Sequence, residues 1–194
     1  MGSTAHGGLT YADLLAYPEE NWPKRELFDG ELVVSPPPAP RHARVQFRLL
    51  VALAPWAEAT GADVSPGWDL EVADGLVMWP DAMVVLAERV HLVNARPSPV
   101  PPDVVVEISS PSTRRRDLIR KRAVYERFGV PEYWFVDLDE DRILVFRLED
   151  GRYGEPDMFA AGDLLESKHL PGFAAPVDRL LNLTSSGEGR SREG

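Results

Sequence analysis

Two carboxylates stand beside strand-like segments that are otherwise almost entirely apolar. Glu107 directly follows three consecutive valines, and Asp81 directly precedes the apolar run AMVVLA. A carboxylate beside so many apolar groups is costly to desolvate unless it is paired or binds a cation. Adjacent strands lie about 4.8 Å apart, so two such carboxylates can converge on one ion. The pattern therefore predicts a divalent-cation site; the alternative is that each acid ends its strand at a solvated rim.

The ligand types in this sequence indicate which ion such a site would hold. The chain contains no cysteine, and the pattern includes no paired histidines of the kind that zinc sites use. Carboxylate and carbonyl oxygens are hard ligands that suit Mg²⁺ or Mn²⁺. We therefore expect Mg²⁺ or Mn²⁺ rather than Zn²⁺.

A strongly basic segment follows Glu107 along the chain. Residues 114–122, RRRDLIRKR, contain six basic residues and one acid, and helical spacing places Asp117 and Lys121 on one face. A strand followed by a helix returns the helix over the sheet, so we expect Lys121 to reach the carboxylates. The alternative is a surface salt bridge between Lys121 and Asp117, which is worth less than about 1 kcal/mol.

Three arginines open this predicted helix. Arg114, Arg115 and Arg116 occupy its first turn, where the helix macrodipole disfavours cations. The free N–H groups at a helix start favour an anion, and arginine side chains would strengthen a phosphate site. We therefore favour a phosphate-rich partner over the alternative of a solvated run of charge.

The elements that must position these residues can be read from periodicity and turn signals. Thr10 is a plausible N-cap for a first helix, Asp29-Gly30 is a two-residue hairpin turn, and Gly129 is a C-cap with Pro131 just beyond it. We expect Pro55 to kink or shorten the second helix. The predicted elements are helices at 10–20, 41–61 and 114–128, a hairpin at 25–36, strands at 63–72, 76–86 and 103–109, and a hairpin formed by EYWFVD and RILVFRL.

Length, charge and composition restrict the class of protein. The 194 residues are 44% hydrophobic and 27% charged, which is typical of a globular chain. We expect one α/β domain over 10–184, a flexible start at 1–9 and a disordered tail at 185–194. The net charge of −10 argues against indiscriminate binding to nucleic acid. The sequence shows neither an apolar signal core nor a run of the ~20 residues that span a membrane, which favours a cytoplasmic location.

Longer motifs resemble a known family. The segments RELFDGELVVSPPPAPRHARV, WPDAMVV and VVVEISSPSTRRRDLIRKRAVYERFGVPEYWFVD resemble the Uma-type restriction endonuclease family of the PD-(D/E)XK superfamily. The resemblance covers roughly residues 10–180. It implies an α/β, restriction-endonuclease-like core: a mixed central β-sheet flanked by helices, with an N-terminal helix and β-hairpin.

The same resemblance assigns roles to individual residues. Pro80-Asp81 corresponds to the "PD" step, and Glu107 corresponds to the second acid. Ser109 stands where the superfamily usually has a lysine, and the Uma-type pattern places that lysine on the following helix, at Lys121. The pattern also carries an acid in the first hairpin, which matches Glu26; spacing alone would leave Glu26 as an ordinary strand residue.

The activity that the resemblance implies is metal-dependent hydrolysis of phosphodiester bonds, with DNA as the expected substrate. Asp81, Glu107 and the carbonyl of Ile108 are expected to hold Mg²⁺ or Mn²⁺, which acidifies a bound water. Lys121 is expected to orient that water or to neutralise the developing charge. Glu26 is expected to hold a second ion or to position water.

Other interpretations stay open from the sequence. His42, at the start of the second helix, is a candidate for phosphate contact or proton transfer, although a half-exposed surface histidine is favoured. A catalytically inactive module that binds nucleic acid or a protein partner also fits, because the net charge is negative and position 109 lacks lysine. A homodimer whose acidic surface is turned away from DNA is a third alternative.

Overall fold

The computed structural model describes residues 8–17, 24–93, 98, 100–109 and 114–183. The predicted tail at 185–194 and most of the predicted flexible start lie outside these ranges. The elements follow in chain order: α1 (Tyr11–Leu15), β1 (Lys24–Phe28), β2 (Glu31–Ser35), α2 (Pro40–Thr60), β3 (Asp63–Ser65), β4 (Leu70–Ala73), β5 (Leu76–Met78), β6 (Ala82–Val85), the 3₁₀-helix η1 (Ala87–Leu92), β7 (Val104–Ile108), the π-helix η2 (Arg116–Lys121), α3 (Arg122–Phe128), β8 (Glu132–Asp137), β9 (Arg142–Glu149), β10 (Arg152–Tyr153), β11 (Asp157–Phe159), β12 (Leu164–Glu166), β13 (Ala174–Pro176) and α4 (Val177–Leu181).

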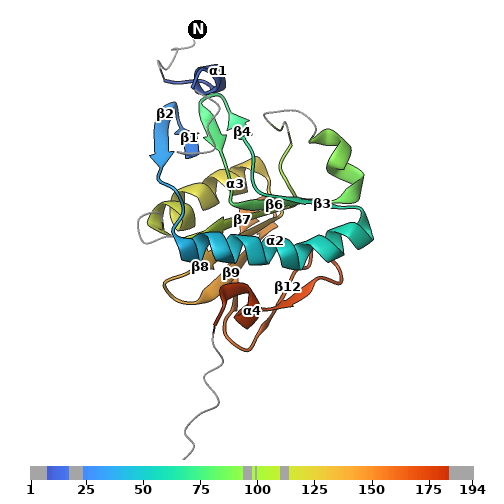
Figure 1. Cartoon of the computed structure of the whole chain (residues 1–194). Helices are drawn as coiled ribbons and strands as arrows, with labels where there is room; N and C mark the ends of the chain where they lie inside the picture. The colour runs from blue at the N-terminus through green and yellow to red at the C-terminus, as the bar shows by residue number, and fades with distance from the viewer. Residues whose placement is uncertain (1–7, 18–23, 94–97, 99, 110–113, 184–194) are drawn as a thin grey trace, which may run out of the picture.

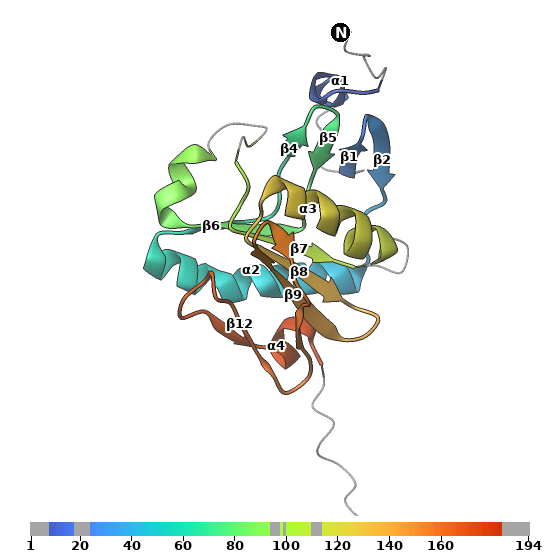
Figure 2. The ribbon, with the colours of Figure 1, turned by 180° about the vertical axis from the view of Figure 1, so that it is seen from behind.

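A mixed seven-stranded sheet forms the centre of the molecule. Its strand order is β10-β9-β8-β7-β6-β3, with β11 paired to β9. Strands β7 and β8 are parallel, whereas β6 and β9 run antiparallel to these neighbours. Helix α2 covers one face of the sheet, and α3 covers the other (Figures 1 and 2). The expected mixed central sheet flanked by helices is thus confirmed.

Apolar side chains that alternate between the two faces of the central strands explain this three-layer arrangement. Val104 and Val106 of β7 pack in the cluster that contains Val45 and Leu49 of α2. Val105 packs instead with Tyr125 of α3. Successive side chains of a strand point to opposite faces, so Glu107 shares the face of Val105, beneath α3. The apolar strand predicted at 103–109 is buried on both faces because a helix covers each of them.

A smaller antiparallel sheet, ordered β2-β1-β5-β4, lies next to the central one (Figure 1). The predicted hairpin turn joins β1 to β2, and both of its residues have positive φ, 52° at Asp29 and 81° at Gly30. Positive φ at both positions is the geometry of a type I′ turn, which Asp-Gly favours. The N-cap at Thr10 is confirmed by a reciprocal capping box with Asp13, although the helix ends at Leu15 rather than near residue 20.

The strands predicted at 63–72 and 76–86 are wrong as single elements. Each is split between the two sheets: β3 and β6 belong to the central sheet, whereas β4 and β5 pair in the smaller one. The crossing point is tight, because a Cβ atom on Gly67 would lie 1.8 Å from the carbonyl oxygen of Pro80. Only glycine fits there, and proline lacks the N–H that would continue a ladder.

Two helices differ in detail from their predicted form. Helix α2 continues through Pro55 to Thr60 and ends at Gly61 in the left-handed conformation. The helix predicted at 114–128 contains a π-helical stretch, η2, before α3 begins, and Gly129 caps α3 as expected. No helix within the described ranges has both the length and the apolar character needed to cross a membrane.

Candidate active site

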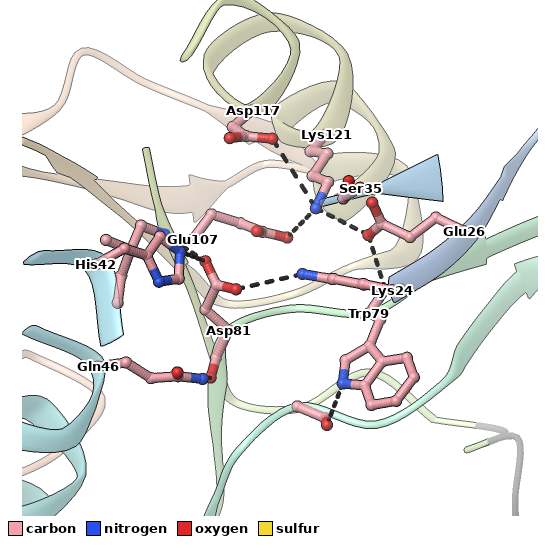
Figure 3. A network of polar contacts seen from close by, with 12 residues as sticks. Lys24, Glu26, Ser35, His42, Gln46, Trp79, Asp81, Glu107, Asp117 and Lys121 are labelled. Carbon is pink, nitrogen blue, oxygen red and sulfur yellow. Dashed lines mark hydrogen bonds and ion pairs between the residues drawn. The ribbon is translucent and has the colours of Figure 1, made fainter. Parts of the chain in front are cut away.

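The predicted acids and the predicted lysine meet where the central sheet, the smaller sheet and η2 come together (Figure 3). The site gathers side chains from five places in the chain: β1, the start of α2, the residue before β6, β7 and η2. The residues are Lys24, Glu26, His42, Asp81, Glu107, Asp117 and Lys121, and all of them are buried. Several ionisable groups of both signs in one buried cluster are the usual signature of a functional site.

Asp81 and Glu107 come together because β6 and β7 are hydrogen-bonded neighbours. The backbone N–H of Asp81 donates to the carbonyl of Val106 at 3.0 Å, and Ile108 N–H donates to Asp81 Oδ2 at 2.8 Å. Asp81 is only 8% exposed and Glu107 only 1%. The alternative in which each acid ends its strand at a solvated rim is therefore wrong.

Lys121 links the acids of two sheets. Its Nζ atom lies 2.8 Å from Glu107 Oε1 and 2.8 Å from Glu26 Oε1, with Asp117 Oδ1 further away at 3.9 Å. Lys121 is 1% exposed, so the surface salt bridge is also wrong. Burial opposes the charged form, but Glu107 and Glu26 outweigh it and raise the pKa of Lys121 above its usual value. The side chain is a fixed cation at neutral pH.

The π-helical turn η2 presents Lys121 to the sheet. Arg122 N–H donates to the carbonyl of Asp117, which is the i to i+5 bond of a π-helix, and the Tyr133 hydroxyl donates to the same carbonyl at 2.9 Å. Asp117 and Lys121 are buried in this turn. Wide turns of this kind are frequent at functional sites, and they redirect side chains that a regular helix would place elsewhere.

Asp81 is held by partners that sequence reasoning only partly anticipated. Lys24 Nζ lies 3.2 Å from Asp81 Oδ1, and His42 Nε2 lies 3.1 Å from Oδ2. Burial favours protonation of Asp81, but Lys24 and His42 outweigh it and hold its pKa well below the usual range. The favoured reading of His42 as a half-exposed surface residue is wrong, because it is buried against Asp81.

Glu26 reaches the cluster from β1 of the smaller sheet. Its Oε1 atom accepts hydrogen bonds from Lys121 and, at 3.0 Å, from the backbone N–H of Trp79. Burial favours the protonated form, but Lys121 and Lys24 outweigh it and lower the pKa of Glu26. The other oxygen, Oε2, is buried and has no hydrogen-bond partner within the described part of the chain.

Glu107 has a second partner that sequence reasoning missed. The Tyr125 hydroxyl donates to Glu107 Oε1 at 2.6 Å. Burial raises the pKa of Glu107 to about 7, although Lys121 and Lys24 favour its ionised form. Tyr125 follows Lys121 by four residues, so helical spacing could have indicated that both side chains face Glu107. Lys24 similarly precedes Glu26 by two, the spacing that shares one face of a strand.

The three arginines at the helix start lie in different surroundings. Arg114 donates to both oxygens of Asp137, at 2.9 and 2.7 Å, and Arg116 donates to Ser35 Oγ at 3.2 Å. Arg115 is exposed. Phosphate binding by these residues stays a prediction, and Arg115 is the most exposed of the three. Ser109, at the usual lysine position, accepts from Leu138 N–H at 3.1 Å.

The chemistry of the cluster fits a hard divalent cation. Negative charge is in excess, because the site contains four carboxylates and two ammonium groups: Glu26, Asp81, Glu107, Asp117, Lys24 and Lys121. Within the described ranges, no three or more acidic or histidine side chains are already arranged to hold a metal. Mg²⁺ typically uses only one or two carboxylates and completes its shell with water and phosphate. The pair Asp81 and Glu107 matches that requirement.

The fold and the site together define a class: restriction-endonuclease-like α/β proteins with two acids on adjacent strands of a mixed sheet. The chain belongs to the Uma2 family, described as "Putative restriction endonuclease", whose model matches residues 11–178. A crystal structure of a "putative nuclease belonging to DUF820" from Anabaena variabilis ATCC 29413 matches with a TM-score of 0.73. The match covers 90% of this chain and 98% of the other at 18% identity, which shows a shared fold. No curated protein matches the chain.

Proposed function

We propose that this protein is a Mg²⁺- or Mn²⁺-dependent endonuclease that hydrolyses phosphodiester bonds of DNA. The family and the fold support nuclease function. The observation that carries the proposal is the buried convergence of Asp81, Glu107 and Lys121, with Lys121 Nζ 2.8 Å from Glu107. Two acids on neighbouring strands and one fixed cation supply the ligands and the positive charge that phosphodiester hydrolysis requires.

Asp81 and Glu107 would hold the ion, with the carbonyl of Ile108 as a third oxygen. The bound ion supplies polarisation of a phosphoryl oxygen and acidification of a water molecule. His42 and the backbone N–H of Ile108 fix the Oδ2 atom of Asp81. Tyr125 fixes the carboxylate of Glu107 in the same way. The chain thus holds both ligands in place before any substrate arrives, which lowers the cost of reorganisation.

Lys121 supplies the fixed positive charge of the reaction. Because Glu26 and Glu107 keep its ammonium charged, Lys121 can donate to the phosphate or to the attacking water as negative charge develops. Glu26 positions Lys121 from the side opposite Glu107. Substitution of the lysine should therefore affect the chemical step rather than the binding of DNA.

Exposed basic residues near η2 are the proposed contacts with the DNA backbone. Arg115 and Arg120 are exposed on this helix, and Arg120 also lies 4.8 Å from the centre of the Phe28 ring. Phosphate contacts made by arginine position a duplex without reading its sequence. They offset the overall net charge of −10 locally, so binding should weaken steeply as salt concentration rises.

The experiment that tests the proposal is incubation of the purified protein with supercoiled plasmid, linear duplex and single-stranded DNA in Mg²⁺, Mn²⁺ or EDTA. We expect cleavage that requires the divalent ion. The competing function is an inactive module that binds nucleic acid or a protein. It is favoured by the way Lys24 and Lys121 already neutralise much of the cluster without an ion. That function predicts metal-independent DNA binding and no cleavage of any substrate.

We also propose a homodimer located in the cytoplasm. Phe47 and Val51 are 67% and 53% exposed on the outer side of α2, four residues apart. Antiparallel pairing of two copies of α2 about Val51 would bring Arg44 opposite Glu58 of the second copy, and both are exposed. Light scattering should give twice the monomer mass; a monomer mass at all concentrations would contradict the dimer.

A further inference from the structure

Lys24 is a buried lysine in the candidate site that the family pattern does not assign. It is 8% exposed, and its Nζ atom lies 3.2 Å from Asp81 Oδ1. The other oxygen of Asp81 accepts from His42 and from the backbone N–H of Ile108. Both oxygens of Asp81 therefore already have donors from the chain itself, and the donor at Oδ1 is a cation that repels a divalent ion.

The bond to Lys24 is the one that can be exchanged. The Ile108 N–H is fixed in the strand and His42 is packed at the start of α2, whereas lysine has a long flexible stem. Lys24 extends from β1 toward Asp81, with Glu26 on the same strand (Figure 3). An ammonium at Asp81 Oδ1 repels a divalent cation bound to the same carboxylate, so the cation should bind more tightly once the ammonium has moved away.

A second carboxylate oxygen is available to receive the displaced ammonium. Glu26 Oε2 is buried and has no hydrogen-bond partner within the described part of the chain. Lys24 and Glu26 are two residues apart on β1, so their side chains leave the same face of the strand. A buried carboxylate oxygen without a partner is costly, so Glu26 Oε2 would gain from an ammonium placed beside it.

We propose that Lys24 is a displaceable internal cation: its ammonium holds Asp81 in the ion-free protein and moves to Glu26 Oε2 when a divalent ion binds Asp81 and Glu107. This inference rests on the proposed function, because it concerns the same ion site. Lys24 then has two consequences. It keeps the ion-free cluster stable, and it weakens the affinity for the ion. It is a positioning residue, because it acts through Asp81.

The matched test compares wild type with Lys24→Met, which keeps a long unbranched side chain, one atom shorter, and removes its charge. Calorimetric titration with Mn²⁺ should give a dissociation constant at least tenfold lower for Lys24→Met, because the ion no longer displaces a cation. Melting in EDTA should show a lower Tm than wild type, and the increase in Tm on adding Mn²⁺ should be larger. Equal or weaker Mn²⁺ affinity in Lys24→Met would overturn the inference.

Arg25→Met is the control for the loss of one positive charge. Arg25 is the next residue of β1 and alternation directs it to the opposite face, where its guanidinium lies 5.2 Å from the centre of the Tyr17 ring. Its substitution should leave the Mn²⁺ dissociation constant within about twofold of wild type, since screened interactions between distant charges are weak. If Arg25→Met also bound Mn²⁺ tenfold more tightly than wild type, the effect would come from net charge, and the role of Lys24 would be overturned.

A second measurement does not depend on how well the variant folds. In a crystal structure of the wild-type protein with Mn²⁺, Lys24 Nζ should be within hydrogen-bond distance of Glu26 Oε2 and away from Asp81. Lys24 still bonded to Asp81 beside a bound ion would overturn the inference while leaving the proposed function intact. Absence of Mn²⁺ binding in both wild type and Lys24→Met would instead overturn the proposed function and the inference with it.

Discussion

The ammonium of Lys121 lies 2.8 Å from Glu107, although the two residues belong to a π-helix and a strand and are 14 positions apart. The same ammonium lies 2.8 Å from Glu26, on a strand of the other sheet. The Lys121 side chain therefore links the two sheets by ion pairs. The protonation of Lys121, Glu26 and Glu107 is coupled, so the charge of each depends on the other two. This relationship makes the role of each residue testable by single substitutions.

Lys121→Met should remove DNA cleavage while DNA binding persists. Loss of a fixed donor that stabilises transition-state charge typically lowers the rate by about 10²–10³-fold. The buried acids Glu26 and Glu107 would lose their shared cation, which should cost about 3–5 kcal/mol of unfolding free energy. Plasmid cleavage rates and chemical denaturation measure the two effects. Wild-type cleavage in a folded Lys121→Met protein would contradict the role of this lysine.

Asp81→Asn and Glu107→Gln should each abolish metal-dependent cleavage and weaken Mn²⁺ binding at least tenfold, because each removes one anionic ligand. EDTA should have the same effect on wild-type cleavage, with activity restored by excess Mg²⁺ or Mn²⁺. The control is Asp150→Asn, an exposed acid in a turn with φ of 50°, which asparagine also accepts. The measurements are plasmid cleavage and calorimetric titration; cleavage unchanged in both site variants would rule out the proposed function.

Tyr125→Phe should lower both stability and cleavage. Phenylalanine removes the hydroxyl that donates to Glu107 at 2.6 Å, at a cost of about 1–3 kcal/mol for a hydrogen bond to a charged group. Tyr153→Phe is a matched control, because its hydroxyl donates at 2.8 Å to the carbonyl of Val130, which is not part of the candidate site. Thermal melts should show a lower Tm for both variants than for wild type, but only Tyr125→Phe should reduce the cleavage rate. Equal cleavage rates in the two variants would assign Tyr125 a purely structural role.

Asp137 should stabilise the start of the basic helix in a pH-dependent manner. Burial raises its pKa, but Arg114 and Arg142 outweigh burial and hold the pKa below its usual value of 3.8. The folded state therefore binds fewer protons than the unfolded chain at acidic pH, so the stabilisation is present above about pH 4 and is lost as pH falls further. Asp137→Asn should lower the unfolding free energy by about 2 kcal/mol at pH 7.

Urea denaturation of wild type and Asp137→Asn between pH 2 and pH 7 measures this contribution. The stability difference between the two proteins should be constant at neutral pH and should shrink below pH 4. The exposed neighbour Asp139, replaced by asparagine, should show little difference from wild type at any pH, because its carboxylate stays in contact with solvent in the folded protein. A difference that grows toward pH 2 would contradict the assigned pairing of Asp137 with Arg114.

Elements with strong local signals were predictable from the sequence. The turn at Asp29-Gly30 requires positive φ, the cap at Gly129 requires the left-handed conformation, and both lie where expected. The strands at 63–72 and 76–86 were not predictable as they stand, because local pattern does not show which sheet a strand joins. That division depends on the close approach of Gly67 to Pro80, a contact between distant segments.

The residues of the candidate site also divide into those that the sequence indicated and those that it did not. Desolvation cost alone indicated Asp81 and Glu107, since a carboxylate next to an apolar strand needs a partner. Lys24 and Tyr125 gave only the weaker signal of their spacing from Glu26 and Lys121, because a lysine or a tyrosine in an amphipathic segment usually reaches solvent. Only the placement of β1 near Asp81 and of α3 over β7 turns both side chains toward the buried acids.

The sequence by itself determined the chemistry: the two strand acids, the basic helix segment and the turns with strong local signals follow from residue type and local spacing. The tertiary structure decided the connections. It directed Arg114 to Asp137, joined Lys121 to acids on two sheets, and paired Lys24 with Asp81. The physical reason is that charge pairing under desolvation acts over a few ångströms, whatever the separation along the chain, so partners from distant segments are fixed only when the sheets pack.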